Sequence, residues 1–174
     1  ARKAFEQRIG RRLPEWPREA LGPLKDEFQR FRQDQVHQAV KRISEAVRRE
    51  FPDTILSVAV WGAWPDCADA QAQDWPVWGR NDWVDWLIPM NYTDNPHQFE
   101  GWLDLQRRQP GVGGKLLPGV GLISSNAELR PDQLLDQLNR IRERNLKGFV
   151  LYRLDSSLVE RVFPYLRAGL HGEE

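Results

Sequence analysis

Aromatic and polar side chains follow four short apolar segments of this sequence, and their types suit the binding of a sugar. A pyranose ring presents apolar C–H faces that stack on Trp or Tyr, and its hydroxyl groups need hydrogen-bond donors and acceptors. The four groups, in chain order, are Trp61-Gly62-Ala63-Trp64 with Asp66, Met90-Asn91-Tyr92 with Asp94, Ser124-Ser125-Asn126, and Tyr152-Arg153 with Asp155. These residue types favour carbohydrate as the ligand.

Tryptophan is concentrated in one part of the chain. The sequence contains eight tryptophans, and six of them lie between residues 61 and 86. A single tryptophan is more often a packing residue than a ligand contact, so most of the six are expected to pack in the core or in loops. We expect at least one member of the cluster to line a sugar pocket, and Trp61 and Trp64 are the best placed.

Glycoside hydrolysis usually needs two carboxylates that flank the scissile bond. Asp94 and Asp155 directly follow apolar segments, and Asp66 lies deeper in a loop. Asp94 suits a turn before Asn95 better than it suits catalysis. Asp155 suits either catalysis or the turn before a helix cap at Ser157. No glutamate follows a strand segment in this way, so Asp155 is the catalytic candidate and a complete acid–base pair is not evident.

Other reaction chemistries lack their sequence signatures. His37, His97 and His171 are scattered without the spacing of metal ligands, so no metal site is expected. The sequence has no G-x-G-x-x-G segment, no phosphate-binding P-loop and no G-x-S-x-G elbow, so no cofactor is expected. The single cysteine, Cys67, rules out an intramolecular disulfide. We interpret Cys67 as a small loop residue, because a catalytic thiol needs an activating base.

The charge balance limits the class of partner. Lys and Arg number 25, Asp and Glu number 25, and the formal net charge is zero. This balance argues against nonspecific binding to nucleic acid or to anionic membranes. No apolar run approaches the length of about 20 residues that spans a membrane. No leader segment is visible, and the sequence leaves the cellular location unknown.

Hydrophobic patterning predicts alternating strands and helices. The strands are expected over residues 54–61, 86–92, 115–123 and 148–152. The first is continuous and rich in β-branched residues, which is typical of a strand buried on both faces of a parallel sheet. The helices are expected over residues 26–50, 96–109, 131–144 and 157–166. Residues 1–24, interrupted by three prolines, are expected to be an irregular lead-in.

A long helix followed by four strand–helix units predicts an α/β fold with a parallel sheet. We interpret residues 1–174 as a single domain that forms the second half of a (β/α)8 TIM barrel. A complete barrel needs about 250 residues, so this chain would be a partial barrel. Sites in such barrels lie at the carboxyl ends of the strands. The four polar groups would therefore share one edge, whereas Asp82 and Asp85, which precede their strand, would lie at the opposite edge.

Four longer segments carry a family resemblance. They are Phe31-Arg32-Gln33-Asp34-Gln35-Val36, Ser57-Val58-Ala59-Val60-Trp61-Gly62-Ala63-Trp64, Trp75-Pro76-Val77-Trp78 and Asp85-Trp86-Leu87-Ile88-Pro89-Met90-Asn91-Tyr92. In combination they resemble the C-terminal half of the barrel domain of the bacterial glycosyl-hydrolase-like family 10, over about residues 5 to 165.

The resemblance implies that Arg32, Trp61, Asn91 and Tyr92 line a sugar cleft, where Arg32 would orient a carboxylate. Met90 replaces the Gln that is usual in the family. The acidic segment that the family carries after its fourth strand has no counterpart in this chain. The resemblance further implies a parent protein that is exported or is a lipoprotein of the cell envelope.

Pattern and resemblance together lead to a functional hypothesis. The chain would be a fragment of a glycoside hydrolase that acts on a cell-wall or extracellular polysaccharide, and it would contribute one wall of the sugar cleft. We expect the isolated fragment to be inactive. The alternatives are a non-catalytic carbohydrate-binding module and a structural half-barrel without activity. A half-barrel exposes two sheet edges and an apolar face, so self-association as a homo-oligomer is expected.

Overall fold

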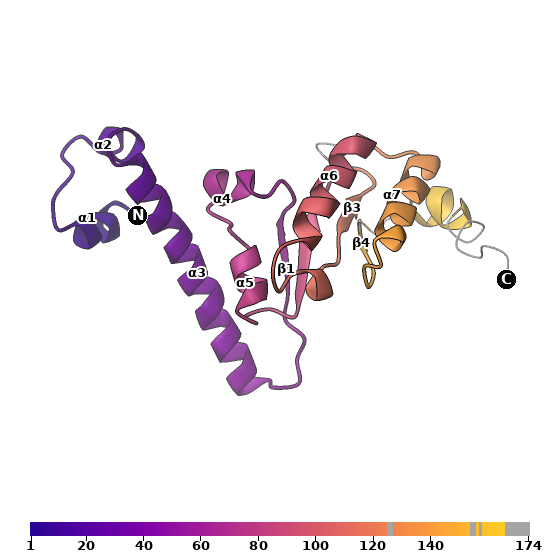
Figure 1. Cartoon of the computed structure of the whole chain (residues 1–174), viewed down its shortest axis with the longest axis horizontal. Coiled ribbons are helices and arrows are strands. Elements are labelled where there is room, and N and C mark those ends of the chain that lie inside the picture. Colours follow the sequence, from indigo (N-terminus) through magenta and orange to yellow (C-terminus); the bar gives the residue numbers. More distant parts are fainter. Residues whose placement is uncertain (125–126, 154–155, 157, 166–174) are drawn as a thin grey trace.

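The computed structural model describes residues 1–124, 127–153, 156 and 158–165 (Figure 1). Its regular elements, in chain order, are α1 (Arg2–Ile9), α2 (Arg18–Leu21), α3 (Lys25–Glu50), β1 (Ser57–Trp61), α4 (Asp66–Ala70), α5 (Pro76–Arg80), β2 (Trp86–Met90), α6 (Pro96–Arg107), the short turn η1 (Gly113–Lys115), β3 (Gly119–Gly121), α7 (Pro131–Glu143), β4 (Val150–Tyr152) and the helical turn η2 (Leu158–Val162). No helix among these residues is long and apolar enough to cross a membrane.

The four strands form one parallel sheet whose order follows the sequence, β1-β2-β3-β4. Each crossover between neighbouring strands contains helix: α4 and α5 in the first, α6 in the second and α7 in the third. The predicted α/β class with a parallel sheet is confirmed. Strands β3 and β4 are only three residues long, shorter than the segments predicted for them.

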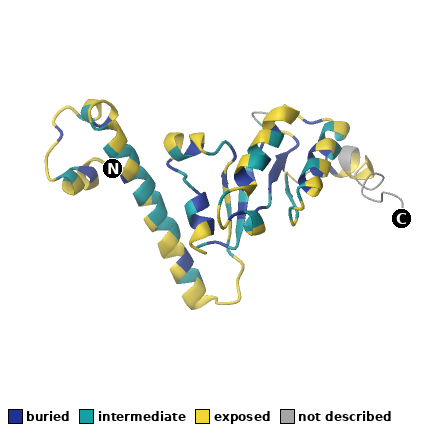
Figure 2. Cartoon of the chain, in the orientation of Figure 1, coloured by how far each residue is buried: buried dark blue, intermediate teal, exposed yellow. Residues whose placement is uncertain are grey.

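Helices cover one face of the sheet. Val60 and Leu87 are fully buried in a cluster with Trp75 and Trp78, onto which helix α3 packs through Val36 and Val40. A second buried cluster joins Val120 of β3 to α6 and α7. Figure 2 shows buried positions, in dark blue, along the strands and along helices α5, α6 and α7. The core therefore lies between a single sheet and a single helical layer.

The other face of the sheet, which we call the open face, consists of alternate residues of each strand. The register places Ser57, Ala59 and Trp61 beside Trp86, Ile88 and Met90, and aligns Met90, Gly119 and Val150 and then Gly121 and Tyr152. Ser57, Ala59 and Trp61 are exposed, whereas Val58 and Val60 face the helices. The prediction that the first strand is buried on both faces is therefore wrong for the described residues, because helices pack on one side only.

The amino-terminal segment differs from the irregular lead-in that was expected over residues 1–24. Helices α1 and α2 fold against the start of α3, and Phe5, Leu13 and Ala20 are buried against Phe31. The ring centroids of Phe5 and Phe31 are 5.2 Å apart. These apolar residues are spaced too irregularly to form one helical stripe, so their shared burial becomes visible only when the chain folds back on α3.

An ion-pair cluster connects the helices that follow β2 and β3. Arg144, directly after α7, donates to Asp104 of α6 at 3.0 and 3.2 Å and to Glu100 at 2.8 Å. The hydrogen bond from Arg144 lowers the pKa of Asp104 to about 2. A carboxylate with a lowered pKa in the folded state stabilises the fold at neutral pH and loses this contribution as the pH falls.

We therefore expect Asp104→Asn to reduce the acid sensitivity of the fold. The free energy of unfolding of the parent chain should fall as the pH is lowered from about 4 to about 2, and the fall should be smaller in the variant. Urea titrations across this pH range measure the difference. Asp94→Asn removes the same charge from an exposed position and serves as the control. Equal acid sensitivity of Asp104→Asn and the parent chain would contradict the assignment.

Candidate functional site

Three aromatic side chains lie at the carboxyl-terminal edge of the sheet, and we call them the aromatic rim. Trp61 ends β1, Tyr92 follows β2 by two residues and Tyr152 ends β4. The rings of Tyr92 and Tyr152 stack with their centroids 5.4 Å apart and their planes 20° from parallel. Trp61 and Tyr152 are each 44% exposed. The rim therefore offers aromatic surface to a ligand.

Strand β3 makes the tyrosine stack possible because it is built from glycine. A Cβ atom on Gly121 would lie 2.8 Å from two carbon atoms of the Tyr92 ring, and a Cβ atom on Gly119 would lie 3.0 Å from the Pro89 carbonyl oxygen. The Tyr92 ring consequently occupies space that a larger residue would fill. From this position it reaches across β3 to Tyr152 on the next strand.

The tryptophan-rich loop fixes the backbone of Trp61. The N–H of Trp61 donates to Gln73 Oε1 at 3.0 Å. The carbonyl oxygen of Trp61 accepts from the indole Nε1 of Trp75 at 3.1 Å and from the thiol of Cys67 at 3.6 Å. Trp75 and Trp78 are buried, as expected for most of the cluster. The loop thus anchors the backbone of Trp61, the partly exposed tryptophan that ends β1.

A buried amide pair connects the ends of β1 and β2. The side chains of Asn91 and Gln106 exchange two hydrogen bonds, at 3.0 and 2.8 Å, and Gln106 Nε2 also donates to the carbonyl oxygen of Gly62 at 2.8 Å. Asn91 and Gln106 are both 0% exposed. A Cβ atom on Gly62 would lie 2.5 Å from Asn91 Oδ1 and 2.6 Å from the Met90 carbonyl oxygen. This pair sets the spacing of the two strand ends that carry Trp61 and Tyr92.

A second buried glutamine supports the segment after β2. Gln137 of α7 donates to the carbonyl oxygen of Thr93 at 2.8 Å. Sequence reasoning missed Gln106 and Gln137 because both lie on helices and away from strand ends. Their positions in the sequence could have indicated their burial. Gln106 lies three residues after Leu103, and Gln137 lies three residues after Leu134, so each glutamine is on the apolar side of its helix. A polar side chain on such a stripe needs a buried hydrogen-bond partner.

Burial also affects the titratable groups near the rim. Desolvation raises the pKa of the Tyr92 phenol, so Tyr92 keeps its proton at neutral pH and can both donate and accept a hydrogen bond. Desolvation raises the pKa of the Cys67 thiol from its ordinary value of 9.0 to about 11. Cys67, interpreted from the sequence as a small loop residue, instead lies in the short helix α4, where it is buried and its thiol contacts the carbonyl oxygens of Trp61 and Gln73.

Cys67 is expected to resist alkylation in the folded chain. The pKa of the Cys67 thiol is about 11, whereas the pKa of a free thiol is about 9. At pH 8 the fraction of Cys67 present as the reactive thiolate is therefore about a hundredfold smaller than that of a free thiol. Iodoacetamide labelling followed by mass spectrometry should therefore be slow in the native chain and fast in guanidinium chloride. Rapid labelling of the native chain, with its secondary structure retained, would contradict the burial of this thiol.

The predicted site residues are distributed over several environments. Trp61 and Tyr92 belong to the rim, and the half-buried Met90 ends β2 on the same open face. Asn91 is buried and engaged with Gln106, so it supports the rim from below rather than facing a ligand. Asp155, the catalytic candidate, lies outside the described residues.

The remaining two predicted contacts are engaged in loop structure. Arg32 donates to the carbonyl oxygens of Asp69 and Ala70 at the end of α4, and to Gln29 within α3. The indole of the half-buried Trp64 donates to Asp74 at 3.0 Å. Both side chains therefore hold the first crossover connection in place.

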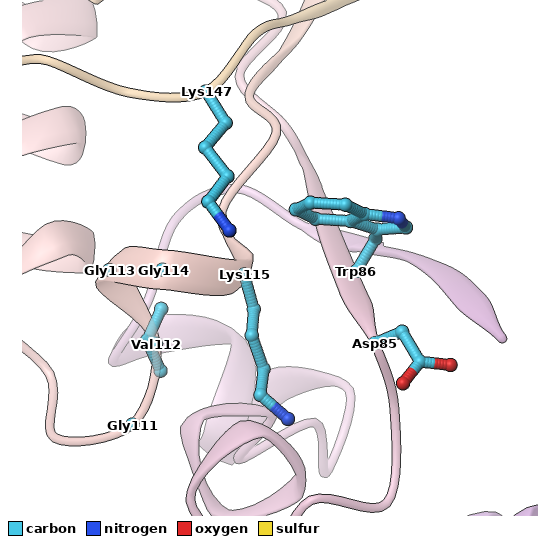
Figure 3. Close-up of a pocket in the computed structure, with 8 residues that line it drawn as sticks. All are labelled: Asp85, Trp86, Gly111, Val112, Gly113, Gly114, Lys115 and Lys147. Carbon is cyan, nitrogen blue, oxygen red and sulfur yellow. The ribbon is translucent and has the colours of Figure 1, made fainter. Parts of the chain in front are cut away.

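The opposite edge of the sheet carries a hollow of about 530 Å³, shown in Figure 3. Lys147 enters it from one side, and its ammonium lies 5.2 Å from the centre of the Trp86 ring. Two acidic groups at this edge are paired: Lys115 donates to Asp82 at 2.6 Å, and Arg48 donates to Asp85 at 2.8 Å. These bonds lower the pKa of both carboxyl groups, as expected of structural ion pairs at the amino ends of strands.

The described part of the chain contains no group of three or more His, Cys, Asp or Glu residues placed to hold an ion. His37 accepts a hydrogen bond from the indole of Trp78 at 2.8 Å, and burial lowers its pKa.

Comparison of the chain with protein-family models, with curated proteins and with solved structures gave no match.

Proposed function

We propose that this chain supplies the carbohydrate-binding wall of a barrel-type glycoside hydrolase. The aromatic rim is the observation that carries the proposal. Two stacked tyrosines and a tryptophan on one edge give flat apolar surface for the C–H faces of a sugar. The neutral phenol of Tyr92 adds a donor and an acceptor for hydroxyl groups. Such a combination of aromatic surface and few polar groups is typical of small-ligand sites.

The partial-barrel interpretation is supported by the sheet itself. Four parallel strands in sequence order, joined by helical crossovers on one face, have the arrangement of successive βα units in a (β/α)8 barrel. In such a barrel the open face becomes the interior, and the rim lies at the edge where catalysis takes place. A cell-wall or extracellular polysaccharide is the proposed substrate class of the parent, following the family resemblance.

Oligosaccharide binding tests the proposal. Isothermal titration of the chain with cello-oligosaccharides and chito-oligosaccharides should detect binding to at least one of them. Trp61→Ala and Tyr152→Ala should each weaken it by about tenfold, equivalent to about 1.4 kcal/mol. Phe51→Ala removes an exposed aromatic ring before β1, at the opposite edge, and should leave binding unchanged. Equal affinities for all three variants and the parent chain would refute a role for the rim.

The aromatic rim contains no carboxylate, so catalysis by the parent would need carboxylates from other residues. Asp155 follows β4 in the sequence and remains the proposed catalytic candidate. We expect no hydrolysis by the isolated 174-residue chain, because a second carboxylate is required. Release of reducing ends from a polysaccharide, lost in Asp155→Asn, would show that the chain alone is an enzyme. Binding without turnover by the parent protein would instead favour a non-catalytic carbohydrate-binding module.

A further inference from the structure

The aromatic rim is divided between two sides of the sheet. Trp61 ends β1 and Tyr152 ends β4, and strands β2 and β3 lie between them (Figure 1). Both rings are partly exposed, and Tyr92 stacks on Tyr152. The rim therefore has a tryptophan platform on one side and a tyrosine platform on the other.

Sheet geometry sets the distance between the two platforms. Neighbouring strands lie about 4.8 Å apart, so the three intervals from β1 to β4 span about 14 Å across the sheet. The register places Trp61 level with Val150, and Tyr152 lies two residues farther along β4. Those two residues add about 7 Å in the direction of the strands, so the platforms are about 16 Å apart along the sheet.

One sugar ring is too short to reach both platforms. With bonds of about 1.5 Å, opposite ring atoms of a pyranose chair are about 3 Å apart, and the bonds through the bridging oxygen extend each unit of a 1,4-linked chain to about 5 Å. About three such units cover the distance between the platforms. The rings that stack on Trp61 and on Tyr152 would then be the first and the fourth of one chain.

The surface between the platforms suits a neutral chain. β3 contributes Gly119 and Gly121, which have no side chains, and β2 ends at the half-buried Met90. The ring of Tyr92 lies against Gly121 and so belongs to the path between the platforms. None of these residues is charged, so a neutral glycan that crosses them leaves no ionic group unpaired.

We infer that the rim binds a linear, neutral glycan that lies across the strand ends, with Trp61 and Tyr152 at separate sugar positions of one chain. This inference rests on the proposed sugar-binding function and adds the direction and the minimum length of the ligand, about four units. Because both contacts belong to one chain, the second contact forms as an intramolecular event and raises the affinity.

Isothermal titration with a chain-length series tests this inference. The ligands are the cello-oligosaccharides and chito-oligosaccharides from the disaccharide to the hexasaccharide. In the series that binds, the parent chain should bind the tetrasaccharide about tenfold more tightly than the disaccharide, and the hexasaccharide should gain little more. Trp61→Ala should bind both the disaccharide and the tetrasaccharide as weakly as the parent chain binds the disaccharide, because one platform remains.

Phe51→Ala is the matched control, because it removes an exposed ring at the opposite edge of the sheet. This variant should keep the dependence of affinity on chain length. Tyr152→Ala removes the exposed ring of the other platform and should also reduce that dependence. It provides the second test if far-UV circular dichroism shows that Trp61→Ala does not fold.

The outcomes separate this inference from the proposed function. Equal affinities of the parent chain for the disaccharide and the tetrasaccharide would overturn the inference and leave sugar binding by the rim intact, because one platform would then be enough. A full dependence on chain length in Trp61→Ala would also overturn it. A parent chain that binds no oligosaccharide of any length would refute the proposed function, and the inference with it.

Discussion

Gly62→Ala is expected to lower the free energy of unfolding by about 3 kcal/mol, a typical cost of overpacking. The new Cβ atom would approach Asn91 Oδ1 to 2.5 Å and the Met90 carbonyl oxygen to 2.6 Å. One of these neighbours is backbone and the other is held in the buried amide pair, so neither moves freely. Urea denaturation followed by tryptophan fluorescence measures the change.

Gly101→Ala is the matched control for this prediction. Gly101 lies within α6, and a Cβ atom there meets nothing within 4 Å. Because alanine is the better helix former, this variant should gain about 0.5–1 kcal/mol of stability. A surface substitution usually changes stability by no more than about 0.5 kcal/mol. A loss of that size or smaller in Gly62→Ala would contradict the close packing of the two strand ends.

Gln106→Met should have a comparable or larger effect, about 3–5 kcal/mol of lost stability. Methionine nearly preserves the side-chain volume, so little of the change comes from a cavity. The substitution removes the partner of both Asn91 side-chain atoms and of the Gly62 carbonyl oxygen. Each buried polar group left without a partner costs about 1–3 kcal/mol. Chemical denaturation of the variant and the parent chain gives the difference.

The double variant Asn91→Leu with Gln106→Met separates this cause from general disruption of the core. Replacing both members of a buried hydrogen-bonded pair by apolar residues can be nearly neutral. The double variant should therefore be more stable than Gln106→Met alone, although the Gly62 carbonyl oxygen stays unpaired. Additive losses from the two substitutions would show that the amide pair is not a coupled unit.

Patterning predicted the elements that carry strong periodicity. The apolar stripe of residues 26–50 corresponds to α3, and the segments 54–61 and 86–92 contain β1 and β2. The strand-end rule also led to Trp61, Tyr92 and Tyr152, because each follows an apolar segment directly. These features depend on local sequence patterns and on the common direction of the strands, so they could be predicted from the sequence alone.

The support beneath the rim could not be predicted in the same way. Gly119 and Gly121 argue against a strand by propensity, yet their missing side chains provide the space for Tyr92. Asn91 resembles a ligand contact by its place after β2, but Gln106 engages it from a helix 15 residues away. Such pairings depend on tertiary contacts between segments that carry no shared local pattern.

The central claim is that the aromatic rim binds sugar, and NMR of the tryptophan indoles tests it most directly. The chain has eight tryptophans, and the indole N–H signals of a ¹⁵N-labelled sample can be assigned by single substitutions. During titration with cello-oligosaccharides and chito-oligosaccharides, the Trp61 signal should shift and saturate for at least one series. The signal of the buried Trp78, whose indole donates to His37, should stay fixed. The claim would be contradicted if the sugar shifted the signals of other tryptophans and left the Trp61 signal unchanged. It would also be contradicted if no indole signal shifted at all.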